Sequence, residues 1–362
     1  MNEEIIKVHC NDGQKTNCPI KLGQIYCDGY KGPNDLKSQQ NPTEYSGRIG
    51  VFSHFHEDHI GAVRQCLGTY DTLIVHPITF KAISALLPGY QFYEQWIPQD
   101  YDTKYPSKAG DIRLLKSNHI PGSSQVHVEI DDTALLYSGD FNYPEMQIRK
   151  AEHLVLDATH GDPWHDGKTD RHSVKNRMFE DVKEKIELNK PVIIRTSAGT
   201  LQELIKHFEI NPSDGQLSHD IPFVTTKKQK SVLLKIYDKV KSDFRDIIEY
   251  DSPEFWRLHR NNKRCVLFLT NEIIDESLQN YYNIIVDKYR FSNNNPAIIP
   301  FDGGCRYNLA SHASIQNILD YVGDVEPKEV ITDHSRSGYA PMLAKQIQLK
   351  YPKINAHPSP QY

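Results

Sequence analysis

Residues 53–59 read Ser53-His54-Phe55-His56-Glu57-Asp58-His59, which places three imidazoles and two carboxylates within seven positions. A lone histidine at a strand end most often only caps the strand, but this density of metal-ligand side chains predicts a metal-binding loop. The short and largely apolar segment 48–52 precedes it, and this pattern predicts a buried strand that runs directly into the loop.

The spacing inside the loop predicts two neighbouring metal ions. Alternate residues of an extended chain share a face, so the imidazoles of His54 and His56 can reach one ion. Asp58 and His59 follow in a turn, from which they can reach a second ion.

Further polar residues stand where later strand-like runs end. These runs cover 112–118, 134–139, 154–156 and 329–332. Any one of them is an ordinary strand end with a polar residue. Polar side chains at the same edge of successive strands together predict a site on one rim of a sheet, built from His119, Asp140, Asp157 and His334.

Two sets of motifs resemble known families. The loop 54–59, with His119-Ile120-Pro121-Gly122-Ser123 and Ser138-Gly139-Asp140-Phe141, resembles the signature of metallo-β-lactamase-fold hydrolases. Three more motifs resemble those of the β-CASP nucleases: Leu156-Asp157-Ala158-Thr159-His160-Gly161, Leu309-Ala310-Ser311-His312-Ala313-Ser314 and Thr332-Asp333-His334. That group includes ribonuclease J, the cleavage and polyadenylation endonuclease, and the Artemis and Apollo type DNA-repair nucleases. The resemblance extends from about residue 28 to the last expected helix.

The resemblance implies an α/β fold, an αββα sandwich with an inserted α/β lobe, in which a dimetal site lies at the sheet edge facing the cleft between the lobes. It also implies two Zn²⁺ ions, although histidine and aspartate ligands accept Mn²⁺ and other divalent metals as well. By resemblance, one ion is held by His54, His56 and His119, the other by Asp58, His59 and His334, and Asp140 bridges both.

The resemblance also assigns supporting and catalytic roles. Asp28 would support the histidine loop by hydrogen bonding, while a plain turn aspartate before Gly29 is the alternative. His312 would protonate the leaving oxygen, and Asp157 would orient its ring. The expected catalytic residues are therefore Asp58, Asp157 and His312.

Length predicts two lobes, because 362 residues exceed one average domain and the interval from Asp157 to His312 is too long for a loop. Strand patterns alternate with helical ones there, which predicts an insert with a largely parallel sheet. We expect metallo-β-lactamase segments at 1–174 and 296–362, and a β-CASP domain at 175–295. The expected elements are strands at 191–196, 221–225, 265–270 and 297–301, the last returning the chain to the first domain, and helices at 199–208, 228–243, 315–322 and 339–350.

Phosphodiester hydrolysis suits such a site, because nonbridging phosphate oxygens can bind two metals and an imidazolium can protonate the departing oxygen. The expected substrate is single-stranded RNA or DNA. In the families that this sequence resembles, a histidine at the position of His334 is associated with RNA-processing members. The motif His312-Ala313-Ser314 is more similar to that of the DNA-repair members. RNA is favoured, with a 5′ exonuclease on DNA as the alternative, and a small-molecule hydrolase or an inactive nucleic-acid-binding scaffold as minor ones.

The net charge of −5 gives no overall attraction for polyanions, so contacts with nucleic acid must be local. The turn Ser197-Ala198-Gly199-Thr200 opens a helix after a strand, where backbone N–H groups can bind a phosphate. Ser197, Gly199 and Thr200 are therefore candidate substrate-binding residues for a 5′-phosphorylated end, although many α/β units have such a turn for structural reasons alone.

The six cysteines are scattered without short paired spacings, so they predict reduced thiols rather than a disulfide framework. The sequence contains no run of the ~20 apolar residues that a membrane span needs. We expect a cytoplasmic enzyme without membrane association. Additional contacts with the substrate would come from the cleft, from a partner or from self-association as a homodimer.

Overall fold

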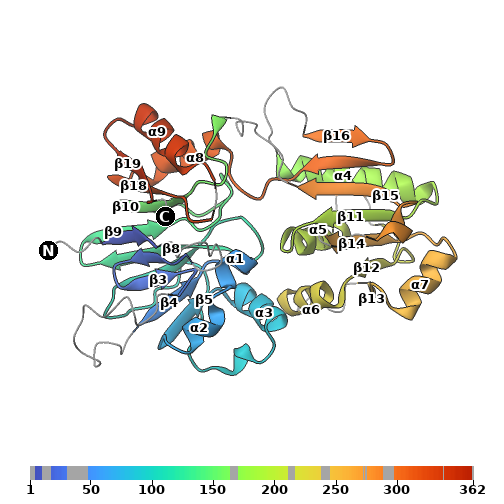
Figure 1. The fold of residues 1–362 in the computed structure, drawn as a ribbon, viewed down its shortest axis with the longest axis horizontal. Helices are drawn as coiled ribbons and strands as arrows, with labels where there is room; N and C mark the ends of the chain where they lie inside the picture. The colour runs from blue at the N-terminus through green and yellow to red at the C-terminus, as the bar shows by residue number, and fades with distance from the viewer. Residues whose placement is uncertain are drawn as a thin grey trace. The chain divides into compact units, whose positions relative to one another are not determined.

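The computed structural model describes residues 5–9, 18–30, 48–163, 170–210, 217–237, 245–271, 273, 275–287, 297–336 and 338–360. The chain forms two compact units (Figure 1). The first consists of Met1–Asp166 and His312–Tyr362, and the second of Gly167–Ser311. Within the described ranges, no helix has the length and apolar character needed to cross a membrane.

The first unit contains two six-stranded sheets. The first sheet follows chain order and carries the strand that leads into the histidine loop, and that strand is buried along its whole length, as predicted. Its strands are β1 (Ile6–Val8), β2 (Ile20–Leu22), β3 (Ile25–Cys27), β4 (Ile49–Phe52), β5 (Thr72–Val75) and β6 (Trp96–Pro98).

The second sheet has the order β19-β18-β10-β9-β8-β7. Its strand β10 lies between β9 and β18 and is parallel to both, so the carboxyl ends of these three strands meet at one edge. Its strands are β7 (Asp111–Lys116), β8 (Ser124–Ile130), β9 (Thr133–Tyr137), β10 (His153–Asp157), β18 (Glu329–Asp333) and β19 (Asn355–Pro358).

Alternating side chains of the second sheet separate two hydrophobic cores. Val155 packs into the core between the two sheets, whereas Leu154 and Leu156 pack into the core beneath α8 (Ile315–Val325) and α9 (Ala340–Lys350). On the first sheet, Phe80 of α3 (Pro77–Leu86) contacts Trp96 of β6. The helix α2 (Val63–Leu67) lies on the same side of the first sheet as α3. The two sheets, with α2 and α3 on one outer face and α8 and α9 on the other, form the expected αββα sandwich (Figure 1).

The second unit is an α/β domain built on one seven-stranded sheet of order β13-β12-β14-β11-β15-β17-β16. Every pairing in it is parallel except that of β16 with β17, so the prediction of a largely parallel insert is confirmed. Both faces are covered by apolar cores, because Ile193 packs on one side and Val192 and Ile194 on the other. The strands are β11 (Val192–Thr196), β12 (Phe223–Thr225), β13 (Ile247–Glu249), β14 (Val266–Thr270), β15 (Tyr282–Asp287), β16 (Ile298–Phe301) and β17 (Gly304–Asn308).

The sequence analysis did not anticipate two α-helices of this unit, α4 and α7, or its 3₁₀ helix. The full set is α4 (Arg171–Glu187), α5 (Thr200–Ile210), α6 (Lys227–Ile236), α7 (Pro253–Arg260) and the 3₁₀ helix η6 (Glu276–Leu278). The first unit adds α1 (Glu57–Ile60) and the 3₁₀ helix η3 (Tyr90–Phe92). Part of the expected helix at 228–243 lies outside the described residues.

The strand at 297–301 forms, but the prediction that it returns the chain to the first domain is wrong. It is β16, which pairs antiparallel with β17 in the sheet of the second unit. The physical reason is local: Asp302-Gly303 links the two strands, and a two-residue turn ending in glycine favours a hairpin. The expected boundary between 174 and 175 falls inside α4, and the one between 295 and 296 lies outside the described residues.

Candidate metal centre

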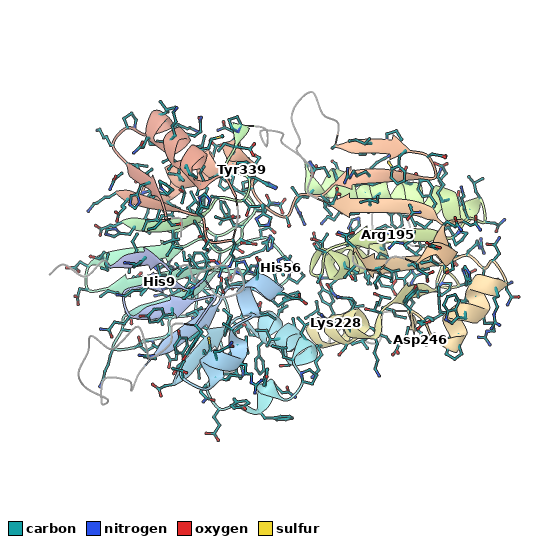
Figure 2. The ribbon with its side chains drawn as sticks, viewed as in Figure 1. His9, His56, Arg195, Lys228, Asp246 and Tyr339 are labelled. Atoms are coloured by element: carbon teal, nitrogen blue, oxygen red, sulfur yellow. The ribbon has the colours of Figure 1, made fainter. Side chains whose placement is uncertain are left out.

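The histidine loop begins at the carboxyl end of β4, a central strand of the first sheet, and leads into α1. His56 has extended backbone angles of φ −68° and ψ 147°, and it immediately precedes the helix (Figure 2). This conformation keeps His54 and His56 on one side of the loop, as the alternation predicted. Asp58 and His59 lie in the helical turn that follows.

Four ligand atoms converge at the loop. His56 Nδ1 lies 3.1 Å from His54 Nε2 and 3.2 Å from His119 Nε2. Asp140 Oδ2 lies 3.6 Å from His54 Nε2 and 3.4 Å from His119 Nε2. Ligands at 2.0–2.1 Å from a tetrahedral zinc ion are about 3.3 Å apart, so this donor set fits a divalent ion. We call His54, His56, His119 and Asp140 the three-histidine group.

Asp140 is placed by the glycine before it. Gly139 has φ +54°, and a Cβ atom there would lie 2.8 Å from the carbonyl oxygen of Ser124. Only glycine fits this left-handed position without strain, so the Gly139-Asp140 turn brings the carboxylate to the loop.

A second set of ligand atoms meets the other oxygen of the same carboxylate. His59 Nε2 lies 3.4 Å from Asp140 Oδ1 and 3.7 Å from Asp58 Oδ2. This nitrogen is buried and has no hydrogen-bond partner among the described residues. We call His59, Asp58 and Asp140 the His59 group. The two oxygens of Asp140 therefore face two different sets of candidate ligands.

The expected ligand His334 stays a predicted ligand. It directly follows β18, it is half-buried, and its backbone N–H donates to Ser359 Oγ at 2.9 Å. Among the described residues it is not one of those whose ligand atoms converge within 4.8 Å of one another.

Asp28 orients two of the histidines. Its Oδ2 accepts hydrogen bonds from His59 Nδ1 at 2.8 Å, from the Ser53 hydroxyl at 2.5 Å and from the Tyr137 hydroxyl at 3.0 Å. Since the one Ser53 hydroxyl hydrogen is donated to Asp28, Ser53 Oγ must accept from His54 Nδ1, 2.9 Å away. Both imidazoles therefore carry a proton on Nδ1, which leaves each Nε2 atom facing the candidate metal positions.

Electrostatics in the cluster favour a cation. Burial lowers the pKa of His54 well below its usual value, and the nearby His59 lowers it further, so His54 is neutral. Burial works against ionisation of Asp140, but His59 and His312 hold the pKa of this carboxyl well below its usual range. Burial would also lower the pKa of His59, yet Asp140 and Asp28 raise it to about 10.

His312 and Asp157 form a pair beside the three-histidine group. The His312 Nδ1–H donates to Asp157 Oδ2 at 2.8 Å, and Asp157 Oδ1 accepts from the backbone N–H of Thr159 at 2.8 Å. His312 Nε2 lies 3.5 Å from Asp140 Oδ2 and is buried without a hydrogen-bond partner in the described parts of the chain. The pair thus presents one ring nitrogen to the ligand cluster.

The sequence analysis missed Arg336, a buried arginine beside the centre. Its guanidinium donates to the carbonyl oxygens of Asp28 at 2.7 Å and Asp58 at 3.2 Å. Burial acts to lower the pKa of Arg336, but Tyr137 and Asp333 outweigh it and raise the pKa above its usual value. The motif Thr332-Asp333-His334 ends two residues before it, and no local pattern indicated that this side chain turns inward.

The predicted phosphate-binding turn lies in the second unit, between β11 and α5. Ser197 is exposed, whereas Gly199 and Thr200 are buried. The backbone N–H of Gly199 is not free, because it donates to Gln202 Oε1 at 2.7 Å. The expectation of a free N–H at Gly199 is therefore wrong, since a side chain of the following helix already caps this position.

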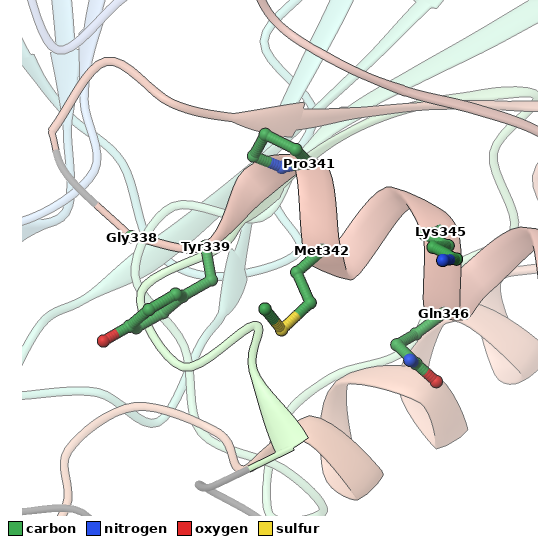
Figure 3. Close-up of a pocket in the computed structure, with 6 residues that line it drawn as sticks. All are labelled: Gly338, Tyr339, Pro341, Met342, Lys345 and Gln346. Carbon is green, nitrogen blue, oxygen red and sulfur yellow. The ribbon is translucent and has the colours of Figure 1, made fainter.

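A separate pocket of about 600 Å³ lies along α9 in the first unit (Figure 3). It contains none of the ligand-group residues. Its lining residues are Gly338, Tyr339, Pro341, Met342, Lys345 and Gln346.

Comparisons with known proteins agree with this geometry. Residues 51–196 match the family model of the metallo-beta-lactamase superfamily. An RNase J-like protein of Methanocaldococcus jannaschii is 25% identical over 196 residues, which are 48% of this chain and 46% of that protein. The protein RNase aCSPSF2 of Saccharolobus solfataricus is 25% identical over 180 residues, 42% of this chain and 36% of that protein. The matches thus span less than half the length of each curated relative.

Among solved structures, a protein of unknown function from Enterococcus faecalis is similar in fold. The TM-score is 0.58 at 12% sequence identity, over 90% of this chain and 93% of the other. The chain carries a metallo-beta-lactamase domain with a candidate divalent-metal cluster, and it resembles the nucleases of the β-CASP family.

Proposed function

We propose that this protein is a metal-dependent nuclease that hydrolyses phosphodiester bonds of single-stranded nucleic acid, with RNA as the favoured substrate. One observation carries the proposal. The three-histidine group and the His59 group share the carboxylate of Asp140, and His312 Nε2 lies 3.5 Å from the same carboxylate. This arrangement supports a site for two cations beside a side chain that could donate a proton.

The chain's own residues have distinct roles in this proposal. Divalent ions, taken as two Zn²⁺ with Mn²⁺ as an alternative, would supply Lewis-acid activation of water and of the phosphoryl oxygens when bound. Asp28 keeps the Nε2 atoms of His54 and His59 directed at the centre, and Asp140 contacts both groups. We include His334 in the ligand set only as a prediction.

His312 is proposed as the general acid. Protonated at Nε2, it would donate to the oxygen that leaves when the phosphodiester bond breaks. Asp157 accepts from the opposite ring nitrogen at 2.8 Å, so it fixes the orientation of the ring.

RNA is favoured over DNA on two grounds. Both curated relatives carry the name of a ribonuclease, and a histidine stands at position 334 in the last motif. We further propose that the second unit corresponds to the β-CASP lobe and that Ser197 and Thr200 contribute to recognition of a 5′-phosphate. A 5′ exonuclease acting on DNA is the second candidate, favoured by His312-Ala313-Ser314.

The test is cleavage of matched single-stranded RNA and DNA oligomers that carry a 5′-phosphate or a 5′-hydroxyl, with the purified protein loaded with Zn²⁺ or Mn²⁺. The proposal predicts cleavage of RNA, faster for the 5′-phosphorylated strand. Preferential cleavage of DNA would support the second candidate. Absence of cleavage of both, by a protein that retains its metal, would contradict a nuclease function.

A further inference from the structure

Arg336 connects three distant segments of the first unit. Its guanidinium donates to the carbonyl oxygens of Cys18 at 3.0 Å, Asp28 at 2.7 Å and Asp58 at 3.2 Å. Its nearest carboxylate contact is longer, 3.5 Å to Asp333 Oδ2. Only 9% of the side chain is exposed, so this arginine mainly donates hydrogen bonds to main-chain carbonyls and does not form a surface ion pair.

Two of these carbonyls flank the hydrogen bond that orients His59. Asp28 has a left-handed backbone with φ 52°, and its carboxylate holds His59 Nδ1. Asp58 lies in the first turn of α1, directly before His59. By binding both carbonyls, the guanidinium fixes the backbone at both ends of the Asp28–His59 interaction.

We propose that Arg336 is a positioning residue of the metal centre, which holds Asp58 and His59 in the geometry that the His59 group needs to bind its ion. The inference rests on the proposed function insofar as the centre binds divalent ions. Among the described residues, Arg336 makes no direct contact with the three-histidine group, so we expect its main effect on the His59 group and a smaller one on His54 through Asp28 and Ser53.

An electrostatic role and a positioning role predict opposite changes in metal affinity when the Arg336 guanidinium is removed. A buried cation repels a metal ion nearby, so a purely electrostatic role predicts tighter metal binding when the guanidinium is removed. A positioning role predicts weaker binding. Lysine separates the two, because it keeps the charge but cannot direct donors to three separate carbonyls as the planar guanidinium does.

The experiment is Zn²⁺ titration of the full chain against a chromophoric chelator, comparing the parent with Arg336→Lys. The proposal predicts that the affinity for the ion of the His59 group falls about 10- to 100-fold, while the affinity for the ion of the three-histidine group falls less. The matched control is Arg245→Lys in the second unit. Arg245 is also buried and donates to three main-chain carbonyls, those of Leu217, Ser218 and Ile221. It also pairs with the buried Glu209 at 2.6 Å, so its substitution should destabilise the chain at least as much as that of Arg336.

Unchanged or tighter binding of every ion by Arg336→Lys would overturn the proposal, as would an equal loss of affinity in Arg245→Lys. Arg336→Gln, which keeps two amide donors without the charge, is measured alongside, with circular dichroism and thermal unfolding on all variants. If Arg336→Lys does not fold, the same affinity criterion applies to Arg336→Gln. Metal affinity is read without substrate, so an inactive parent would contradict the nuclease proposal and leave this result standing.

Discussion

His59 Nδ1 lies 2.8 Å from Asp28 Oδ2, although 31 positions separate the two residues in the chain. Both side chains are buried, with 1% and 0% exposure, so no water competes for this bond. It keeps a proton on Nδ1 of His59, and it leaves Nε2 facing Asp140. The orientation of a candidate metal ligand therefore depends on a carboxylate outside the ligand groups.

Asp28→Asn should weaken metal binding about 10- to 100-fold. An amide has one acceptor oxygen, whereas the Asp28 carboxylate accepts from the backbone N–H of Ser53 on Oδ1 and from three donors on Oδ2. Competition with a metal chelator measures the affinity. Tyr137→Phe is the control, because it removes a single donor and should cause a smaller loss. Equal affinity of Asp28→Asn and the parent would show that the carboxylate does not support the site.

His59→Ala should abolish nucleic-acid cleavage while the fold is largely retained. The substitution removes the ring that faces Asp140 Oδ1 at 3.4 Å, and with it the His59 group. Cleavage of labelled oligomers and thermal unfolding are measured together. His127→Ala is a matched control, since His127 is also a buried histidine of the first unit and lies in β8 outside the ligand groups. A His59→Ala variant that cleaves as fast as the parent would refute the two-ion assignment.

His312→Ala should separate chemistry from metal binding. Loss of a general acid lowers the rate by about 10²–10⁴-fold when the leaving oxygen needs a proton. A p-nitrophenyl phosphodiester has a leaving group that needs no protonation, so its hydrolysis should fall far less. The bound metal, measured by elemental analysis, should stay as in the parent. Equal rate losses on both substrates, or loss of metal, would argue against the acid role.

Glu203 should make the stability of the second unit depend on acid pH. Its carboxylate binds Arg171 Nη2 at 2.6 Å and Lys175 Nζ at 2.9 Å, with all three side chains less than a quarter exposed. Burial opposes ionisation, but Arg171 and Lys175 hold the pKa of Glu203 below its usual value. A lowered pKa in the folded state adds stability that is present above the unfolded carboxyl pKa, roughly 4.3, and is lost as the pH falls through the folded value.

Glu203→Gln should therefore reduce the free energy of unfolding by about 1.5–3 kcal/mol near neutral pH. Below the folded pKa of Glu203 the difference from the parent should disappear. Urea unfolding at several pH values measures both quantities. If the two proteins differ in free energy of unfolding by the same amount at every acid pH, the ionised carboxylate of Glu203 does not contribute the stability.

Local patterns predicted much of the fold because they act over a few residues. The apolar run before the histidines forms β4, and the runs that end near Asp140 and Asp157 form β9 and β10. The strand at 297–301 was assigned to the wrong unit because an apolar run predicts a strand but not the sheet that it joins. The Asp302-Gly303 turn was the available signal for its pairing with β17.

The site was predictable where the ligands are dense in sequence and less so where they depend on distant contacts. His54, His56, His119 and Asp140 converge as expected. Arg336 meets Asp28 from 308 positions away, and nothing in its neighbourhood distinguishes an inward arginine from a solvated one. The capping of Gly199 by Gln202 depends on a side-chain rotamer, which a turn motif does not specify.

Anomalous diffraction at the zinc edge, from crystals of the zinc-loaded protein, tests the central claim most directly. We predict one peak between His54 Nε2, His56 Nδ1 and His119 Nε2, and a second beside His59 Nε2, with Asp140 between the two. A zinc-saturated crystal without a peak among the three histidines would contradict the metal centre and the nuclease proposal built on it.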